Sequence, residues 1–181
     1  MPRTKLIAAN WKMYKTPDQT RDFFRDFLPL VAGNDRDEIV VCPPYVDLAA
    51  AMEAAKGSNI AVGAQNLHWK EVGAFTGEIS APMLLSLGVT HVLVGHSERR
   101  QYFGETDDTV NLRLKAALEG GLTPICCVGE VLEERAAGHA GDGGDGGRGR
   151  LDITGLDEVQ SRLNERLAGS QTAHDAAILR T

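Results

Sequence analysis

The sequence predicts an α/β protein whose parallel sheet forms the first part of an eight-stranded (β/α)₈ barrel. Short apolar runs alternate five times with helical patterns, and these runs are too continuous for strands with one wet face. The first strand-to-helix turn carries no glycine-rich dinucleotide motif, which counts against an open doubly wound sheet. Polar side chains follow directly after several runs, and in a barrel such positions converge on one face.

The composition is typical of a soluble globular domain. The chain has 181 residues and a net charge of −6, with 43% hydrophobic and 24% charged residues. The acidic balance argues against nucleic acid or a membrane as the main partner. No apolar run approaches the ~20 residues of a membrane span, and no signal-peptide pattern is present. Three cysteines, two of them adjacent, favour a reducing cytoplasmic location, and no Cys/His spacing predicts a metal site.

The first half of the chain predicts three strands and two helices. The strand patterns lie at residues 5–10, 38–42 and 60–64. Thr16 followed by Pro17 predicts a capped helix start, and we expect Pro29 to end or kink this helix early. An alanine-rich helix is predicted over residues 46–56, with Gly57 as its C-cap.

A long polar loop over residues 65–78 separates these elements from the next ones. Beyond it, two strands are predicted at residues 91–94 and 122–128. Ser80 and Pro82 begin a short helix before the first of these strands. Thr106 caps a helix over residues 107–119 before the second strand.

The character of the chain changes after the fifth strand. Residues 141–150 read GDGGDGGRGR, which contains no apolar residue and predicts a flexible linker; its Asp-Gly repeats lack the spacing of a calcium loop. Apolar residues at helical spacing predict a helix over residues 156–167, and residues 171–181 predict a second frayed helix and no strand. We therefore expect a partial barrel over residues 1–140 and an unrelated Gly-rich tail over residues 141–181.

The stretch from Thr90 to Thr106 holds the strongest candidates for catalysis. Its strand ends at Gly95, and His96 and Glu98 follow at the carboxyl end, where α/β enzymes place catalytic groups. The alternative interpretation is a solvated polar turn or a cluster of ion pairs.

Six motifs together carry a family resemblance. They are NWKM (10–13), CPPY (42–45), GAQN (63–66), GAFTGE (73–78), VGHSERR (94–100) and CVGE (127–130). Each is weak alone, but the ordered set resembles triosephosphate isomerases from residue 4 to about residue 140. The resemblance implies the TIM (β/α)₈ barrel and the interconversion of dihydroxyacetone phosphate and glyceraldehyde 3-phosphate, a step of glycolysis and gluconeogenesis. It implies no cofactor and no metal.

The resemblance also assigns roles to four residues. Lys12 would stabilise negative charge that develops on the substrate, and Asn10 would bind the substrate and orient Lys12. His96 would be the electrophile; in this family a helix N-terminus is known to keep that histidine neutral, a property inherited with the resemblance. Glu98 would lie behind His96 and Lys12. The alternatives are a surface lysine, a turn asparagine, and an ion pair of Glu98 with a neighbouring arginine.

The loop GAFTGE has glycines at both ends and Phe75 near its middle. An exposed aromatic on such a loop is typical of a contact site, and the alternative is a loop folded back on its own barrel. By resemblance the loop inserts into a second subunit, where Thr76 braces that subunit's site, and this implies a homodimer. Cys127 is expected near the same interface or behind its strand, without a chemical role.

Three family features are missing from these 181 residues. No glutamate precedes a proline, so the family's general-base motif is absent, and so are the lid's Gly-Thr-Gly run and the Gly-Gly pair of strand eight that holds phosphate. We therefore expect very low isomerase activity and two unpaired edges, at strands one and five. The alternatives are an inactive truncated or frame-shifted remnant and a partner-binding fragment.

Overall fold

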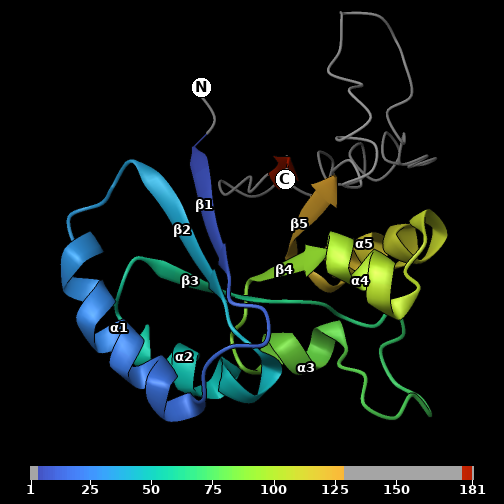
Figure 1. The fold of residues 1–181 in the computed structure, drawn as a ribbon, viewed down its shortest axis with the longest axis horizontal. Helices are drawn as coiled ribbons and strands as arrows, with labels where there is room; N and C mark the ends of the chain where they lie inside the picture. Colours follow the sequence, from blue (N-terminus) through green and yellow to red (C-terminus); the bar gives the residue numbers. More distant parts are fainter. Residues whose placement is uncertain (1–3, 129–176, 181) are drawn as a thin grey trace, which may run out of the picture.

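The computed structural model describes residues 4–128 and 177–180, and it shows strands alternating with helices (Figure 1). The elements are β1 (Lys5–Asn10), α1 (Pro17–Val31), β2 (Asp37–Cys42), the 3₁₀ helix η1 (Tyr45–Asp47), α2 (Leu48–Ala54), β3 (Ile60–Ala64), α3 (Ala81–Ser86), β4 (His91–Val94), α4 (Ser97–Phe103), α5 (Asp107–Gly120), β5 (Thr123–Val128) and β6 (Ala177–Arg180). The five predicted strands are confirmed to within one residue at either end.

The strands form one parallel sheet in the order β1-β2-β3-β4-β5-β6. The sheet curves around an interior, and the helices lie on its outer side (Figure 1). This is the arrangement of a partial (β/α)₈ barrel, and it confirms the predicted fold class.

Side chains of β2, β3, β4 and β5 alternate between two apolar clusters. Ile39 and Val41 of β2 belong to the cluster under the helices, whereas Val40 and Cys42 belong to the interior cluster with residues of β4 and β5. Cys127 lies in the same interior cluster. Burial raises the pKa of the Cys42 thiol to about 12 and that of Cys127 to about 11, so both remain protonated near neutral pH.

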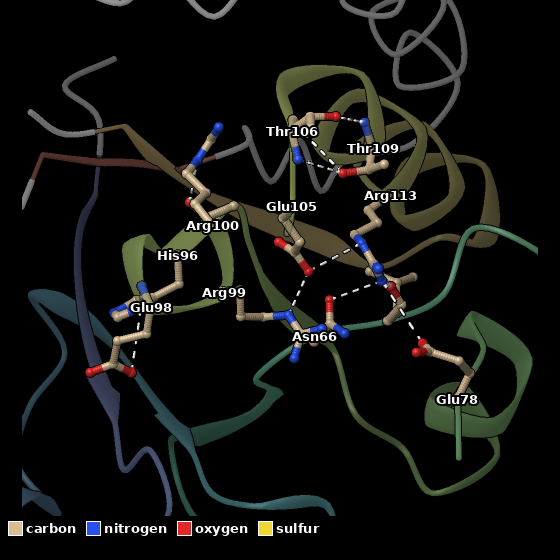
Figure 2. Close-up of polar contacts among 12 residues, drawn as sticks. Asn66, Glu78, His96, Glu98, Arg99, Arg100, Glu105, Thr106, Thr109 and Arg113 are labelled. Carbon is tan, nitrogen blue, oxygen red and sulfur yellow. Dashed lines mark hydrogen bonds and ion pairs between the residues drawn. The ribbon is translucent and has the colours of Figure 1, made fainter. Parts of the chain in front are cut away.

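The helix ends largely follow the predicted signals. The Thr106 hydroxyl accepts a hydrogen bond from the Thr109 amide at 3.4 Å, and the Thr109 hydroxyl accepts one from the Thr106 amide at 2.9 Å (Figure 2). Gly121 ends α5 with a left-handed φ of 92°. The prediction for Gly57 was wrong: α2 ends earlier and Ala55 is its C-cap, although Gly57 itself has a φ of 79°.

Pro29 neither ends nor visibly shortens its helix, contrary to the prediction, because α1 continues to Val31. The proline stands in the last turn, where its missing N–H removes only one intrahelical hydrogen bond. The helix ends two residues after Pro29, so few intrahelical hydrogen bonds lie beyond the proline.

The expectation of no strand in residues 171–181 was also wrong. Ala177–Arg180 form β6, which pairs in parallel with β5 from Ile125 to Val128. The edges of the described sheet are therefore β1 and β6, and not β1 and β5. A run of four residues is too short to show a strand's periodic pattern. The strand conformation of β6 instead comes from its hydrogen bonds with the edge of β5. The predicted linker and the helix over residues 156–167 lie outside the described residues.

The absence of a side chain at Gly63 of β3 allows residues of the neighbouring strands β2 and β4 to pack closely against it. A Cβ at this position would lie 2.7 Å from Cys42 Sγ, 3.1 Å from Val40 Cγ1 and 3.2 Å from His91 Cβ. These atoms belong to short side chains close to the backbone, so they have little room to move.

We predict that Gly63→Ala lowers the free energy of unfolding by about 1–3 kcal/mol, the usual cost of overpacking. Gly33→Ala is the matched control, because nothing lies within 4 Å of its Cβ position. Urea unfolding followed by circular dichroism measures both. Equal effects of the two substitutions would contradict this account of Gly63.

Candidate active site

The candidate site lies at the carboxyl ends of the strands, as the sequence predicts. Asn10 ends β1 and Lys12 follows it, Gln65 follows β3, and His96 and Glu98 follow β4. In a parallel sheet these ends share one edge, and the contacts below bring these side chains together.

Lys12 has a backbone conformation that non-glycine residues rarely adopt, with φ of 55°. Its amide donates to Asn10 Oδ1 at 2.9 Å, and its carbonyl accepts from Gln65 Nε2 at 2.9 Å. The same Gln65 nitrogen donates to the carbonyl of Cys42 at 2.9 Å. Lys12 is therefore held from both sides of its backbone, which is how a strained residue persists.

The ammonium of Lys12 contacts Glu98. Lys12 Nζ lies 2.6 Å from Glu98 Oε1, and both side chains are partly exposed. The hydrogen bond that Lys12 donates to Glu98, and next the charge of Glu98, raise the pKa of Lys12 above its ordinary value of 10.5. Lys12 is thus kept cationic at any physiological pH.

His96 is the N-cap residue of α4, and its Nδ1 accepts from the Glu98 amide at 3.3 Å. A ring nitrogen that accepts a hydrogen bond leaves the other ring nitrogen as the donor, here Nε2. Glu98 Oε2 lies 3.7 Å from Nδ1, beyond hydrogen-bond distance. The backbone of α4 therefore orients His96 with Nε2 as its donor.

The neighbouring arginines are engaged by other carboxylates. Arg99 Nε lies 2.5 Å from Glu105 Oε1 (Figure 2), and Arg100 Nη1 lies 2.7 Å from Asp107 Oδ1. The ion pair of Glu98 with either arginine, the alternative in the sequence analysis, is not what the described chain forms. Glu98 instead forms its ion pair with Lys12.

Glu105 belongs to a buried network that the sequence did not reveal. Its Oε1 also lies 3.3 Å from Arg113 Nε, and Arg113 Nη1 donates to Asn66 Oδ1 at 3.2 Å and to the carbonyl of Leu67 (Figure 2). The network joins α4, α5 and the loop after β3. No local signal could have found it, because Asn66 and Arg113 are far apart in sequence.

Phe75 is 43% exposed and also rests on its own subunit. Its ring lies 4.2 Å from that of His68, which stacks on Trp69 at 4.3 Å. The loop over residues 73–78 is thus supported from beneath while Phe75 and Thr76 remain accessible.

Within residues 4–128 and 177–180, no three His, Cys, Asp or Glu side chains are grouped closely enough to hold a metal ion. None of the helices there is long and apolar enough to cross a membrane.

Comparison with known proteins identifies the family. The family model described as triosephosphate isomerase matches residues 5–142. The chain belongs to the triosephosphate isomerase family. The triosephosphate isomerase of Solibacter usitatus is 60% identical over 136 residues, which cover 75% of this chain and 55% of that protein. A solved triosephosphate isomerase structure from Bartonella henselae matches with a TM-score of 0.71 and 33% identity, covering 98% of this chain and 67% of that one.

The chain spans about half the length of the first of these family relatives. The triosephosphate isomerase of Moorella thermoacetica is 53% identical over 160 residues, which cover 88% of this chain and 64% of that protein.

We predict that Glu98→Gln lowers the pKa of Lys12 toward 10.5, because the raised value comes from Glu98. A raised pKa also means that the ion pair stabilises the folded state below pH 10.5, and that this contribution is lost as pH rises through the folded pKa. Reductive ¹³C-methylation and NMR titration of Lys12 measure the shift. Glu53→Gln on α2 is the control, and an unchanged pKa in Glu98→Gln would disprove the assignment.

Proposed function

We propose that Asn10, Lys12, His96 and Glu98 form the part of a triosephosphate isomerase site that binds a phosphorylated triose and stabilises its enediolate. The observation that carries this proposal is the ion pair of 2.6 Å between Lys12 and Glu98, beside a histidine whose Nδ1 accepts from backbone. Membership of the family supplies the reaction class.

In the isomerisation, a proton leaves the carbon next to a carbonyl, and negative charge develops on the carbonyl oxygen. A cation and a neutral N–H aimed at that oxygen stabilise the enediolate more than the substrate. Lys12 provides the cation, and Nε2 of His96 provides the donor. A neutral imidazole can also pass a proton between the two oxygens of the enediolate, which an imidazolium does less readily.

Glu98 acts in this scheme through Lys12. Its carboxylate keeps the ammonium protonated and fixes the end of a long flexible side chain. Asn10 and Gln65 fix the other end of the same residue through its backbone. We therefore assign Glu98 a positioning role.

The proton on carbon needs a base, and the described carboxylates near the site are occupied. Glu98 pairs with Lys12, and buried Glu105 pairs with Arg99 and Arg113. The family's Glu-Pro motif does not occur in these 181 residues. We propose that the chain by itself carries out isomerisation very poorly.

We further propose that the chain forms a homodimer through the loop over residues 73–78. Phe75 is exposed on a rigid aromatic base, so its ordering in a contact costs little conformational entropy. Thr76 is the exposed neighbour that would reach the second subunit.

Binding of 2-phosphoglycolate, an anionic analogue of the enediolate, tests the site directly. We predict that Lys12→Ala reduces the affinity measured by calorimetry at least tenfold, because the ammonium that would attract the anionic ligand is removed. Lys56→Ala, on the exposed turn after α2, should bind like the unsubstituted chain. Undiminished binding by Lys12→Ala would remove Lys12 from the site.

Turnover is tested with glyceraldehyde 3-phosphate in a coupled assay. We predict a rate below that of a full-length family member by at least the ~10²–10⁴-fold that a general base contributes. His96→Gln should reduce the residual rate further. Full turnover that is lost on this substitution would show that another base acts in this chain.

A further inference from the structure

The loop that carries Lys12 joins β1 to α1, and two of its residues lie in the left-handed region of backbone conformation. Lys12 has φ of 55°, and Lys15 has φ of 80°. This conformation costs free energy in a residue other than glycine, so it persists only where other contacts hold it. Asn10 and Gln65 hold the backbone of Lys12. Lys15 has no part in the site described above, and its conformation needs a separate explanation.

The ammonium of Lys15 lies over two aromatic rings. Its Nζ is 5.2 Å from the ring centroid of Trp11 and 5.4 Å from that of Phe23. The two rings meet edge to face, with their centroids 4.9 Å apart. A cation over the face of an aromatic ring is attracted by the ring quadrupole, most strongly by that of tryptophan. Lys15 therefore has side-chain contacts that can hold its unfavourable backbone conformation.

These contacts connect the start of the loop to the helix that follows it. Trp11 directly precedes Lys12, and the Trp11 amide donates to the carbonyl of Cys42 at 3.0 Å. Phe23 belongs to α1, the helix after the loop. Through its contacts with both rings, Lys15 thus ties the residue next to Lys12 to α1.

The tip of the loop gains little support from burial. Met13 is 94% exposed and Tyr14 is 71% exposed, so neither side chain packs into the apolar clusters. The loop conformation therefore depends on how the backbone is held on either side of the tip, at Lys12 and at Lys15. The contact between Lys12 Nζ and Glu98 depends in turn on that conformation.

We propose that Lys15 is a positioning residue for the candidate site. Its contacts with Trp11 and Phe23 hold the loop in the conformation that directs Lys12 toward Glu98. Lys15 acts through the loop and does not touch the substrate. The proposal rests on the proposed function only for its effect on ligand binding, because the effect on Lys12 is measured without a ligand.

The alternative is that Lys15 affects the site by its charge alone. A nearby cation disfavours the protonated form of Lys12, so loss of the charge of Lys15 would leave the pKa of Lys12 unchanged or raise it. Loss of positioning has the opposite sign. Lys12 then leaves Glu98, and its raised pKa falls toward 10.5. The sign of the change in pKa therefore separates the two roles.

The experiment measures the pKa of Lys12 by ¹³C-methylation and NMR titration in variants of Lys15. Lys15→Met removes the cation, and we expect the pKa of Lys12 to fall toward 10.5. Lys15→Gly also relieves the left-handed backbone strain, and we expect the same fall, because the contacts with the rings are lost. Lys15→Arg keeps a cation over the rings and should restore the value of the unsubstituted chain. Lys56→Met, on the exposed turn after α2, is the matched control.

Calorimetry with 2-phosphoglycolate gives a second measurement, and circular dichroism confirms that each variant is folded. We expect Lys15→Met and Lys15→Gly to bind about fivefold more weakly, the equilibrium effect of losing one exposed cation–π contact. A pKa of Lys12 that is unchanged or raised in Lys15→Met, or unchanged in Lys15→Gly, would overturn the proposal. Absence of binding by the unsubstituted chain would instead contradict the proposed function, and the pKa of Lys12 would still decide the role of Lys15.

Discussion

The side-chain amide of Gln65 ties together the ends of three neighbouring strands. Gln65 follows the end of β3. Its Nε2 donates hydrogen bonds to the carbonyl of Cys42, at the end of β2, and to the carbonyl of Lys12, just beyond β1. The left-handed backbone of Lys12 depends on this support and on Asn10. Without it the ammonium would not be directed at Glu98, and the candidate site would lose its cation.

The charged residues of the site are divided between two tasks. Glu105 and Asp107 bind Arg99 and Arg100, so α4 is anchored to its surroundings by ion pairs that do not involve Lys12, His96 or Glu98. Glu98 on the same helix remains available to Lys12. The contact that holds the Lys12 ammonium therefore also occupies the Glu98 carboxylate.

The strands, their order and the candidate residues could be predicted because each depends on local sequence or on an ordered set of motifs. The positions of Asn10, Lys12 and His96 follow from the strand ends, and the structure brings Lys12 and Glu98 into contact. The conformation of Lys12 and the role of Gln65 could not be predicted, because they arise from hydrogen bonds between distant residues. Tertiary pairing likewise overrode the predicted frayed helix at Ala177–Arg180, which form β6.

The order of strands in the sheet equals their order along the chain. Each of the first five strands therefore meets its neighbour across a short stretch of chain, and the sheet can grow in the direction of synthesis, one βα unit after another. The step from β5 to β6 is different, because residues 129–176 lie between them. Because the entropy cost of loop closure rises with the length of the segment, we expect β6 to pair after the other strands.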